Sequence, residues 1–137
     1  RRWPETYRVL AMKGAEMILL GYNTPDGVPW DPVYDHLMSF HNHLVMQSGA
    51  YQNGSWVVGV AKAGREDYCN LIGGSCIIAP TGEIVAQALT QDDELITAVC
   101  DLDYAQRCKE IVFNFAEHRQ IEHYGIITSQ RGETPPA

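Results

Sequence analysis

Two short apolar runs separated by a long helical pattern constrain the fold of this chain more than any other feature. The runs at 15–20 and 56–61 each have the length of a buried strand. Between them, the stretch from Tyr34 to Asn53 carries apolar side chains at steps of three and four, and Gly54 follows as a helix stop. Because helices interleave with buried strands in this order, the sequence predicts a layered α/β protein.

The rest of the pattern predicts one domain with a mixed sheet. A helix is expected from Pro4 to Lys13, with Gly14 as its C-terminal cap. A polar loop is expected from Lys62 to Asn70, and a short helix from Leu102 to Lys109. Further strands are expected at 75–79, 83–87 and 94–101, the first two joined by a tight hairpin turn at 80–82. Hairpins beside a strand–helix–strand unit favour a mixed sheet over an all-parallel one.

Composition excludes several functional classes. The 137 residues carry a net charge of −7, and beyond Arg1-Arg2 the basic residues do not cluster. Nucleic-acid binding needs a basic face, so it is not expected. No apolar run approaches the ~20 residues of a membrane span, so no membrane partner is expected either. The four cysteines have no dense framework, which is typical of reduced thiols and predicts a cytoplasmic protein.

Two sets of polar residues are candidates for ligand binding. Asn23 and Thr24 follow the first buried strand, where ligands gather in open α/β sheets. Their amide and hydroxyl groups could fix a carboxylate, an amide or a ureido group, or they could only shape the turn before Pro25. Arg1 and Arg2 precede a helix and could bind a carboxylate bidentately. Taken alone, they could equally be exposed arginines without a ligand.

The histidines and cysteines carry no expected chemistry. On a helix His36 and His43 share a face, while His41 points away from them, so no metal site is expected. A reactive thiol needs a basic partner or positive surroundings. Cys76 lies inside an apolar strand, and only Cys108 has basic neighbours. The cysteines are therefore interpreted as structural.

Several segments together resemble the nitrilase superfamily, and within it the N-carbamoyl-D-amino-acid amidohydrolases. The hairpin at 74–85 resembles the superfamily's most recognisable segment, and 48–54 resembles a helix end of the carbamoylase branch. The residues at 114–125 resemble the C-terminal segment of that branch. The resemblance implies an α/β fold of the αββα sandwich type, of which residues 1–137 would be the C-terminal part of a single domain. The Pro- and Gly-containing end, from about 126 to 137, is expected to be a flexible tail.

The resemblance also implies a Glu-Lys-Cys triad that works without metal or cofactor. In this superfamily the thiolate attacks the ureido carbonyl to give a covalent carbamoyl-enzyme, which water then resolves. The overall products are a D-amino acid, ammonia and carbon dioxide. The nucleophile lies in a Cys-Asn-Asp sequence directly before the Arg-Arg pair, which here would be upstream of Arg1. None of the four cysteines present matches it. The chain alone is therefore expected to hold no catalytic residue and to be inactive.

For the substrate, the resemblance assigns Arg1 and Arg2 to the α-carboxylate of an N-carbamoyl amino acid and Asn23 and Thr24 to the pocket loop. Three alternatives remain open: a β-ureidopropionase-like enzyme, an aliphatic amidase, and a non-catalytic homologue that acts as a binding or assembly module. An aromatic tail containing Phe113, Phe115 and Tyr124 predicts a homodimer or homotetramer.

Overall fold

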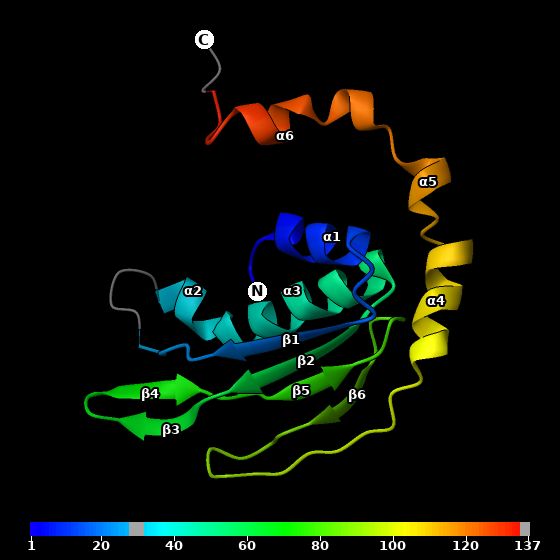
Figure 1. Ribbon diagram of the computed structural model, residues 1–137. Helices are drawn as coiled ribbons and strands as arrows, with labels where there is room; N and C mark the ends of the chain where they lie inside the picture. Colours follow the sequence, from blue (N-terminus) through cyan, green and yellow to red (C-terminus); the bar gives the residue numbers. More distant parts are fainter. Residues whose placement is uncertain (28–31, 135–137) are drawn as a thin grey trace.

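A mixed four-stranded sheet forms the centre of the computed structural model, which describes residues 1–27 and 32–134 (Figure 1). The strands are β1 (Met17–Tyr22), β2 (Trp56–Ala61), β5 (Cys76–Ile78) and β6 (Ile84–Gln87), in the spatial order β1-β2-β5-β6. β1 and β2 are parallel, whereas β5 pairs antiparallel with both of its neighbours. The predicted mixed sheet and its hairpin are therefore confirmed.

The parallel pair requires a crossover connection, and helices supply it. These are α2 (Pro32–His36) and α3 (Met38–Asn53). The sequence predicts one helix over this stretch, but the structure divides it at Leu37, whose N–H donates to the carbonyl of Tyr34 at 3.1 Å in a tighter turn. The predicted end is confirmed: Gly54 has a φ of 54°, the left-handed conformation that glycine adopts readily.

Helix α1 (Pro4–Met12) packs against α3 at a glycine, on the same side of the sheet (Figure 1). A Cβ at Gly49 would lie 2.6 Å from Cε1 of Tyr7, a distance that side chains cannot tolerate. The absence of a side chain at Gly49 thus lets the buried ring of Tyr7 reach the surface of α3. The predicted helix and its stop at Gly14 are confirmed.

The face of α3 that is buried differs from its apolar stripe. Phe40, Leu44 and Tyr51 belong to the periodic pattern that predicts the helix, yet they are 59%, 46% and 48% exposed. The buried side of α3 consists of Met38, Asn42, Met46, Gly49, Ala50 and Asn53. Two asparagines and two small residues therefore occupy positions where an apolar stripe would be expected.

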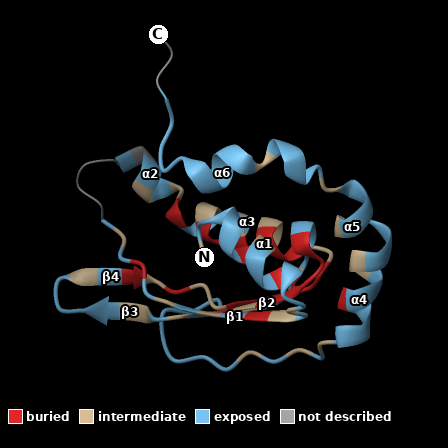
Figure 2. Cartoon of the chain, turned by 45° about the horizontal axis from the view of Figure 1, so that its top comes forward, coloured by how far each residue is buried: buried red, intermediate tan, exposed pale blue. Residues whose placement is uncertain are grey.

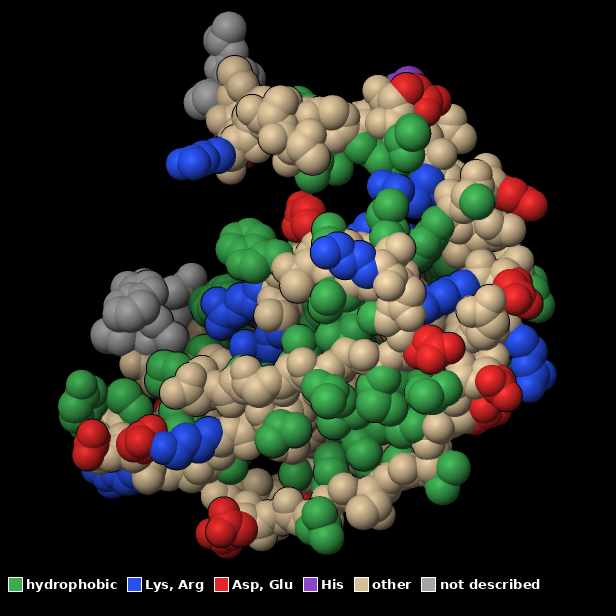
Figure 3. Space-filling view, viewed as in Figure 1, with side chains coloured by type: hydrophobic (Ala, Val, Ile, Leu, Met, Phe, Trp, Pro, Cys, Tyr) green, Lys and Arg blue, Asp and Glu red, His purple; other side chains and the backbone are tan. Residues whose placement is uncertain are grey.

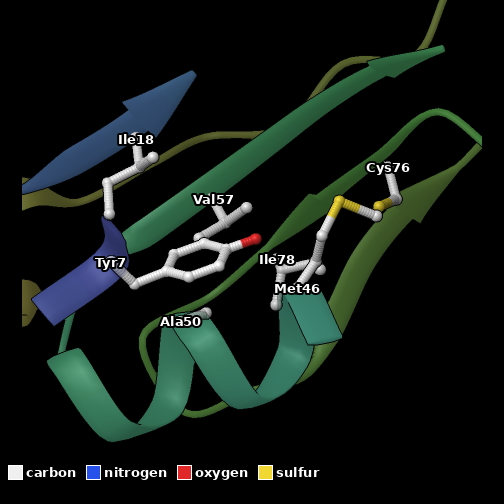
Figure 4. Packing of buried hydrophobic residues seen from close by; sticks show 7 residues of the cluster. All are labelled: Tyr7, Ile18, Met46, Ala50, Val57, Cys76 and Ile78. Carbon is white, nitrogen blue, oxygen red and sulfur yellow. The ribbon is translucent and has the colours of Figure 1, made fainter. Parts of the chain in front are cut away.

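The main core lies between the sheet and these two helices. Figure 4 shows the side chains of Tyr7, Ile18, Met46, Ala50, Val57, Cys76 and Ile78 converging there. They come from α1, α3 and three neighbouring strands, and Figure 2 shows the buried residues concentrated in this layer. Burial of this cluster is what holds the N-terminal segment against α3.

A smaller cluster lies on the other face of the sheet, and it corrects one prediction. Trp56, Ile77, Ala79 and Ala105 form it, and Ile96, Ala98 and Cys100 pack against it. The strand predicted at 94–101 is wrong: these residues join no strand of the described chain. Their alternating burial is strand-like, but they lie against the side chains of the sheet instead of pairing with its edge.

The polar loop predicted from Lys62 to Asn70 is a second correction. It contains most of a two-stranded hairpin, formed by β3 (Ala63–Glu66) and β4 (Cys69–Ile72). The turn is made by Asp67, which has a φ of 52°. Aspartate can adopt this conformation without glycine, so the stretch lacks the usual hairpin signal.

The C-terminal part runs along the outside of the molecule (Figures 1 and 2). It consists of α4 (Leu102–Ile111), α5 (Phe115–His118), a 3₁₀ turn (Ile121–His123) and α6 (Gly125–Ser129). The predicted helix from Leu102 is confirmed and extends two residues further. The stretch for which a flexible tail is expected begins within α6, and residues 135–137 lie outside the described residues. Among the described residues, no helix has the length and apolar character needed to cross a membrane.

Candidate functional site

Arg1 is held by three groups from different elements. Its Nε donates to Oδ1 of Asn42 on α3 at 2.7 Å, and its Nη2 donates to Oγ1 of Thr24 at 2.8 Å. Its guanidinium carbon lies 4.1 Å from the centre of the Tyr22 ring, within cation–π distance. These contacts tie Arg1 to the end of β1 and to the first half of α3.

Further hydrogen bonds extend this network to the loop before β5. Nδ2 of Asn42 donates to the hydroxyl of Tyr22 at 2.9 Å, and that hydroxyl donates to the carbonyl of Gly74 at 3.2 Å. Nε2 of His43 also lies 3.2 Å from this carbonyl. Gly74 has a φ of 77°, and a Cβ there would lie 3.2 Å from His43 Nε2, so glycine suits both the backbone and the space.

Burial shapes the electrostatics of the network. Partial burial lowers the pKa of Arg1, and nearby Arg2 lowers it further, while Tyr22 raises it. An arginine remains charged under these conditions because its ordinary pKa is so high. Burial also raises the pKa of Tyr22, so this hydroxyl keeps its proton and its hydrogen bond to Gly74 at neutral pH.

A cavity of about 470 Å³ opens beside this network. It is lined by Arg1, Arg2, Trp3, Tyr34, Met38, His41, Asn42 and Val45. Two guanidinium groups thus meet apolar and aromatic walls, and none of the described lining residues is acidic. Such a cavity favours a small ligand with an anionic group and an apolar part.

The four predicted binding residues occupy different places relative to this cavity. Arg1 and Arg2 line the same cavity, as their prediction requires. Thr24 is 5% exposed and lies behind Arg1, where it accepts a hydrogen bond from the guanidinium. Asn23 is exposed and is absent from the cavity wall. Substrate binding by all four stays a prediction, and Thr24 is placed to act through Arg1.

Reasoning from the sequence assigned no role to the side chains of Asn42 and Tyr22, whereas it expected His41 to support helix packing near the pocket. His41 is expected to point away from the other helical histidines, and it packs near the rings of Tyr34 and Phe40. The signal for Asn42 was its position, four residues from Met38 and from Met46 on one side of a helix. A polar residue in such a row needs a buried partner.

The cysteines of the chain are free thiols that fit the expected structural role. Burial raises the pKa of the Cys76 thiol to about 11, which keeps it protonated at neutral pH. Burial also raises the pKa of Cys100 and, despite the opposing effect of Arg107, that of Cys108. Among the described residues, no group of three or more metal-ligating side chains converges.

Comparison with known proteins supplies the family context of this site. The family model described as carbon-nitrogen hydrolase matches residues 1–110. An N-carbamoylputrescine amidase of rice (Oryza sativa subsp. japonica) is 32% identical over 140 residues, covering 96% of the chain and 45% of that protein. A probable nitrilase of Schizosaccharomyces pombe is 26% identical, covering 93% of the chain and 43% of that protein.

A solved structure supports the fold. The carbon-nitrogen hydrolase of Helicobacter pylori superposes with a TM-score of 0.79 at 20% identity, covering 93% of this chain and 46% of that one. At this identity the likeness concerns the fold alone, and it agrees with the nitrilase-type α/β arrangement expected from the sequence. The chain spans less than half the length of each of these three proteins.

Proposed function

Because the chain belongs to the carbon-nitrogen hydrolase family, we propose that it supplies the carboxylate-binding side of an enzyme that hydrolyses N-carbamoyl-D-amino acids. The observation that carries this proposal is the cavity with Arg1 and Arg2 in its wall and no acidic residue among its described lining. A guanidinium group can bind a carboxylate through two parallel hydrogen bonds. The apolar wall, with Trp3, Met38 and Val45, suits an amino-acid side chain.

In this proposal the reacting groups come from outside residues 1–137. A cysteine thiolate would attack the ureido carbonyl, a glutamate would transfer protons, and a lysine would stabilise the developing oxyanion. The chain's own contribution is to hold the substrate's carboxylate at a fixed distance from that carbonyl. Orientation of this kind lowers the barrier because the reacting atoms no longer have to find one another.

The rice relative suggests a second candidate function. Its name states that it acts on N-carbamoylputrescine, whose far end is an amine. A protonated amine would be repelled by two guanidinium groups in the cavity wall, so the charge of the site favours a carboxylate.

A β-ureidopropionase-like enzyme would also bind a carboxylate, whereas an aliphatic amidase would leave both arginines without a ligand. A non-catalytic homologue remains the alternative from a different class.

A substrate panel on the complete protein tests this function. Ammonia release would be measured with N-carbamoyl-D-amino acids, their L-enantiomers, N-carbamoyl-β-alanine, N-carbamoylputrescine and a simple aliphatic amide. We expect the highest kcat/KM for a D-enantiomer. Preference for N-carbamoylputrescine or the simple amide would contradict the proposal, and no turnover of any substrate would favour the binding module.

Arginine variants link the panel to the cavity. Arg2→Ala should raise KM for the N-carbamoyl-D-amino acid by about tenfold, because one charge-assisted contact to the carboxylate is lost. Arg107→Ala, on the exposed side of α4, is the matched control and should leave KM unchanged. Equal values for the two variants would argue against carboxylate binding in this cavity.

A further inference from the structure

Asn42 is a buried polar residue in the first half of α3, and packing alone does not explain it. It is 2% exposed and lies in the row Met38, Asn42, Met46 on the buried side of α3. Asparagine is a weaker helix former than leucine or methionine, and burial of an amide costs free energy unless it is hydrogen-bonded. Its two polar atoms must therefore be explained by their partners.

Those partners allow only one orientation of the amide. The carbonyl of Gly74 can only accept, so the Tyr22 hydroxyl donates to it. The same hydroxyl then accepts from Nδ2 of Asn42, which leaves Oδ1 directed at Arg1. Arginine has donors only, so its Nε must meet an acceptor here. Along the hydrogen bonds that connect Gly74 to Arg1, every donor therefore meets an acceptor.

The hydrogen bond between Asn42 and Arg1 determines which edge of the guanidinium remains for a ligand. A guanidinium can bind a carboxylate through Nε and one terminal nitrogen, or through its two terminal nitrogens. Nε is engaged by Asn42 and one hydrogen of Nη2 by Thr24, while the Tyr22 ring lies against one face. Two hydrogens on Nη1 and one on Nη2 have no part in these contacts.

We propose that Asn42 is a positioning residue, which holds Arg1 so that its two terminal nitrogens receive the substrate's carboxylate. The inference rests on the proposed function, in which Arg1 binds that carboxylate. It goes further by assigning the orientation of Arg1 to a residue on another element, 41 positions away in the chain. Asn42 thereby determines specificity for carboxylate-bearing substrates through Arg1.

The test compares Asn42→Leu and Asn42→Asp with wild type in the complete protein. Leucine removes both hydrogen bonds within the apolar row. Aspartate keeps the shape and the acceptor but places a competing negative charge beside Nε. Each variant is assayed with an N-carbamoyl-D-amino acid and with the matching alkylurea, which lacks the carboxylate. Where turnover of the alkylurea is too slow for its KM to be measured, its Ki as a competitive inhibitor is measured instead.

We expect KM for the carboxylate substrate to rise by about tenfold in both variants. Leucine no longer orients Arg1, and the charge of aspartate competes with the substrate's carboxylate for the guanidinium. The values for the alkylurea should stay within about twofold of wild type. Asn53→Leu is the matched control, because Asn53 is equally buried on α3 but bonds to the carbonyl of Gly49. It should leave the ratio between the two substrates unchanged.

Three results would overturn the inference. Equal losses on both substrates would mean that Asn42 has only a structural role, and so would a change in the substrate ratio in Asn53→Leu as large as that in Asn42→Leu. An unchanged KM for the carboxylate substrate would mean that Arg1 needs no orientation by Asn42. Failure of the proposed function is visible separately: wild-type protein would then show no preference for the carboxylate substrate over the alkylurea.

Discussion

At the scale of single residues, Tyr7 combines tight packing with an unsatisfied hydroxyl. It is 2% exposed, and its hydroxyl has no hydrogen-bond partner within residues 1–27 and 32–134. Burial raises the pKa of Tyr7 to about 12. An unfolded tyrosine loses its proton near pH 10. The folded form therefore keeps this proton up to a higher pH than the unfolded form. The contribution of this pKa difference to the free energy of unfolding is fully present below about pH 10 and is lost as the pH rises towards about 12.

Tyr7→Phe should consequently be tolerated or stabilising. Removal of a buried hydroxyl without a partner is expected to raise the free energy of unfolding by up to about 1 kcal/mol at pH 7. The difference from wild type should grow between about pH 10 and about pH 12, where only wild type has this tyrosine to deprotonate. Urea denaturation of the complete protein across this range measures both effects.

Tyr68→Phe provides the comparison, because Tyr68 is 90% exposed. It should leave the free energy of unfolding at pH 7 unchanged. If Tyr7→Phe destabilises the protein instead, the hydroxyl has a partner that contributes to the fold.

At the scale of elements, the ends of the helices have local explanations that can be tested. Helix α4 begins after Asp101, whose Oδ1 accepts from the N–H of Asp103 at 3.0 Å. This is an N-cap, which satisfies one of the helix's open donors. The carbonyl of Asp101 also accepts from Nε1 of Trp56 at 2.9 Å, so the start of α4 is tied to β2.

Asp101→Ala should therefore lower the free energy of unfolding by about 1 kcal/mol, through loss of the cap alone. Asp101→Asn is the control and should remain near wild type, because asparagine caps helices about as well as aspartate. Thermal and urea unfolding of both variants distinguish the cases. A similar loss in both would show that the charge, and not the cap, is what stabilises α4.

At the scale of the whole molecule, much apolar surface is left exposed. Leu19 on β1 and Val60 on β2 are 71% and 60% exposed, and Figure 3 shows hydrophobic side chains gathered over the strands. The C-terminal elements α5, the 3₁₀ turn and α6 have no buried residue. Ile121, Ile126 and Ile127 are each more than half exposed. Exposed apolar area of this kind is typical of interaction surfaces.

On the C-terminal surface, Ile127 and Thr128 of α6 line a cavity of about 610 Å³, which is also lined by α1, the end of α3 and residues between 112 and 119. We expect this surface to take part in a homodimer or homotetramer of the complete protein. Ile126→Asp should then shift the protein towards the monomer, because a charge would be buried in the contact. Sedimentation velocity measures the shift. Ser129→Asp, exposed on the same helix, is the control and should not alter the assembly.

An unchanged assembly in Ile126→Asp would exclude α6 from the contact between subunits. A monomeric wild-type protein would contradict the expected oligomer altogether. Both outcomes leave the proposed hydrolase function untouched, because the cavity beside Arg1 has separate walls.

Reasoning from the sequence succeeded where the deciding signal is local. The apolar run at 56–61 is a strand with the predicted bounds, and the glycines after α1 and α3 end these helices as predicted. The hairpin of β5 and β6 also follows from nearby residues, since a tight turn separates two short apolar runs. In each case the backbone preference and the partner lie within a few residues of each other.

Only the tertiary structure decided which groups far apart in the sequence meet. The helical pattern predicts α3, but the packing of Tyr7 on Gly49 decides which side of it is buried. Segment 94–101 has the alternation of a strand, yet it packs on a cluster and pairs with no strand among the described residues. The sequence indicated that Arg1 and Thr24 could bind a ligand, while the fold placed Asn42 between Arg1 and Tyr22. The physical reason is that periodicity determines the conformation of a segment, whereas its partners depend on the free energy of packing the whole chain.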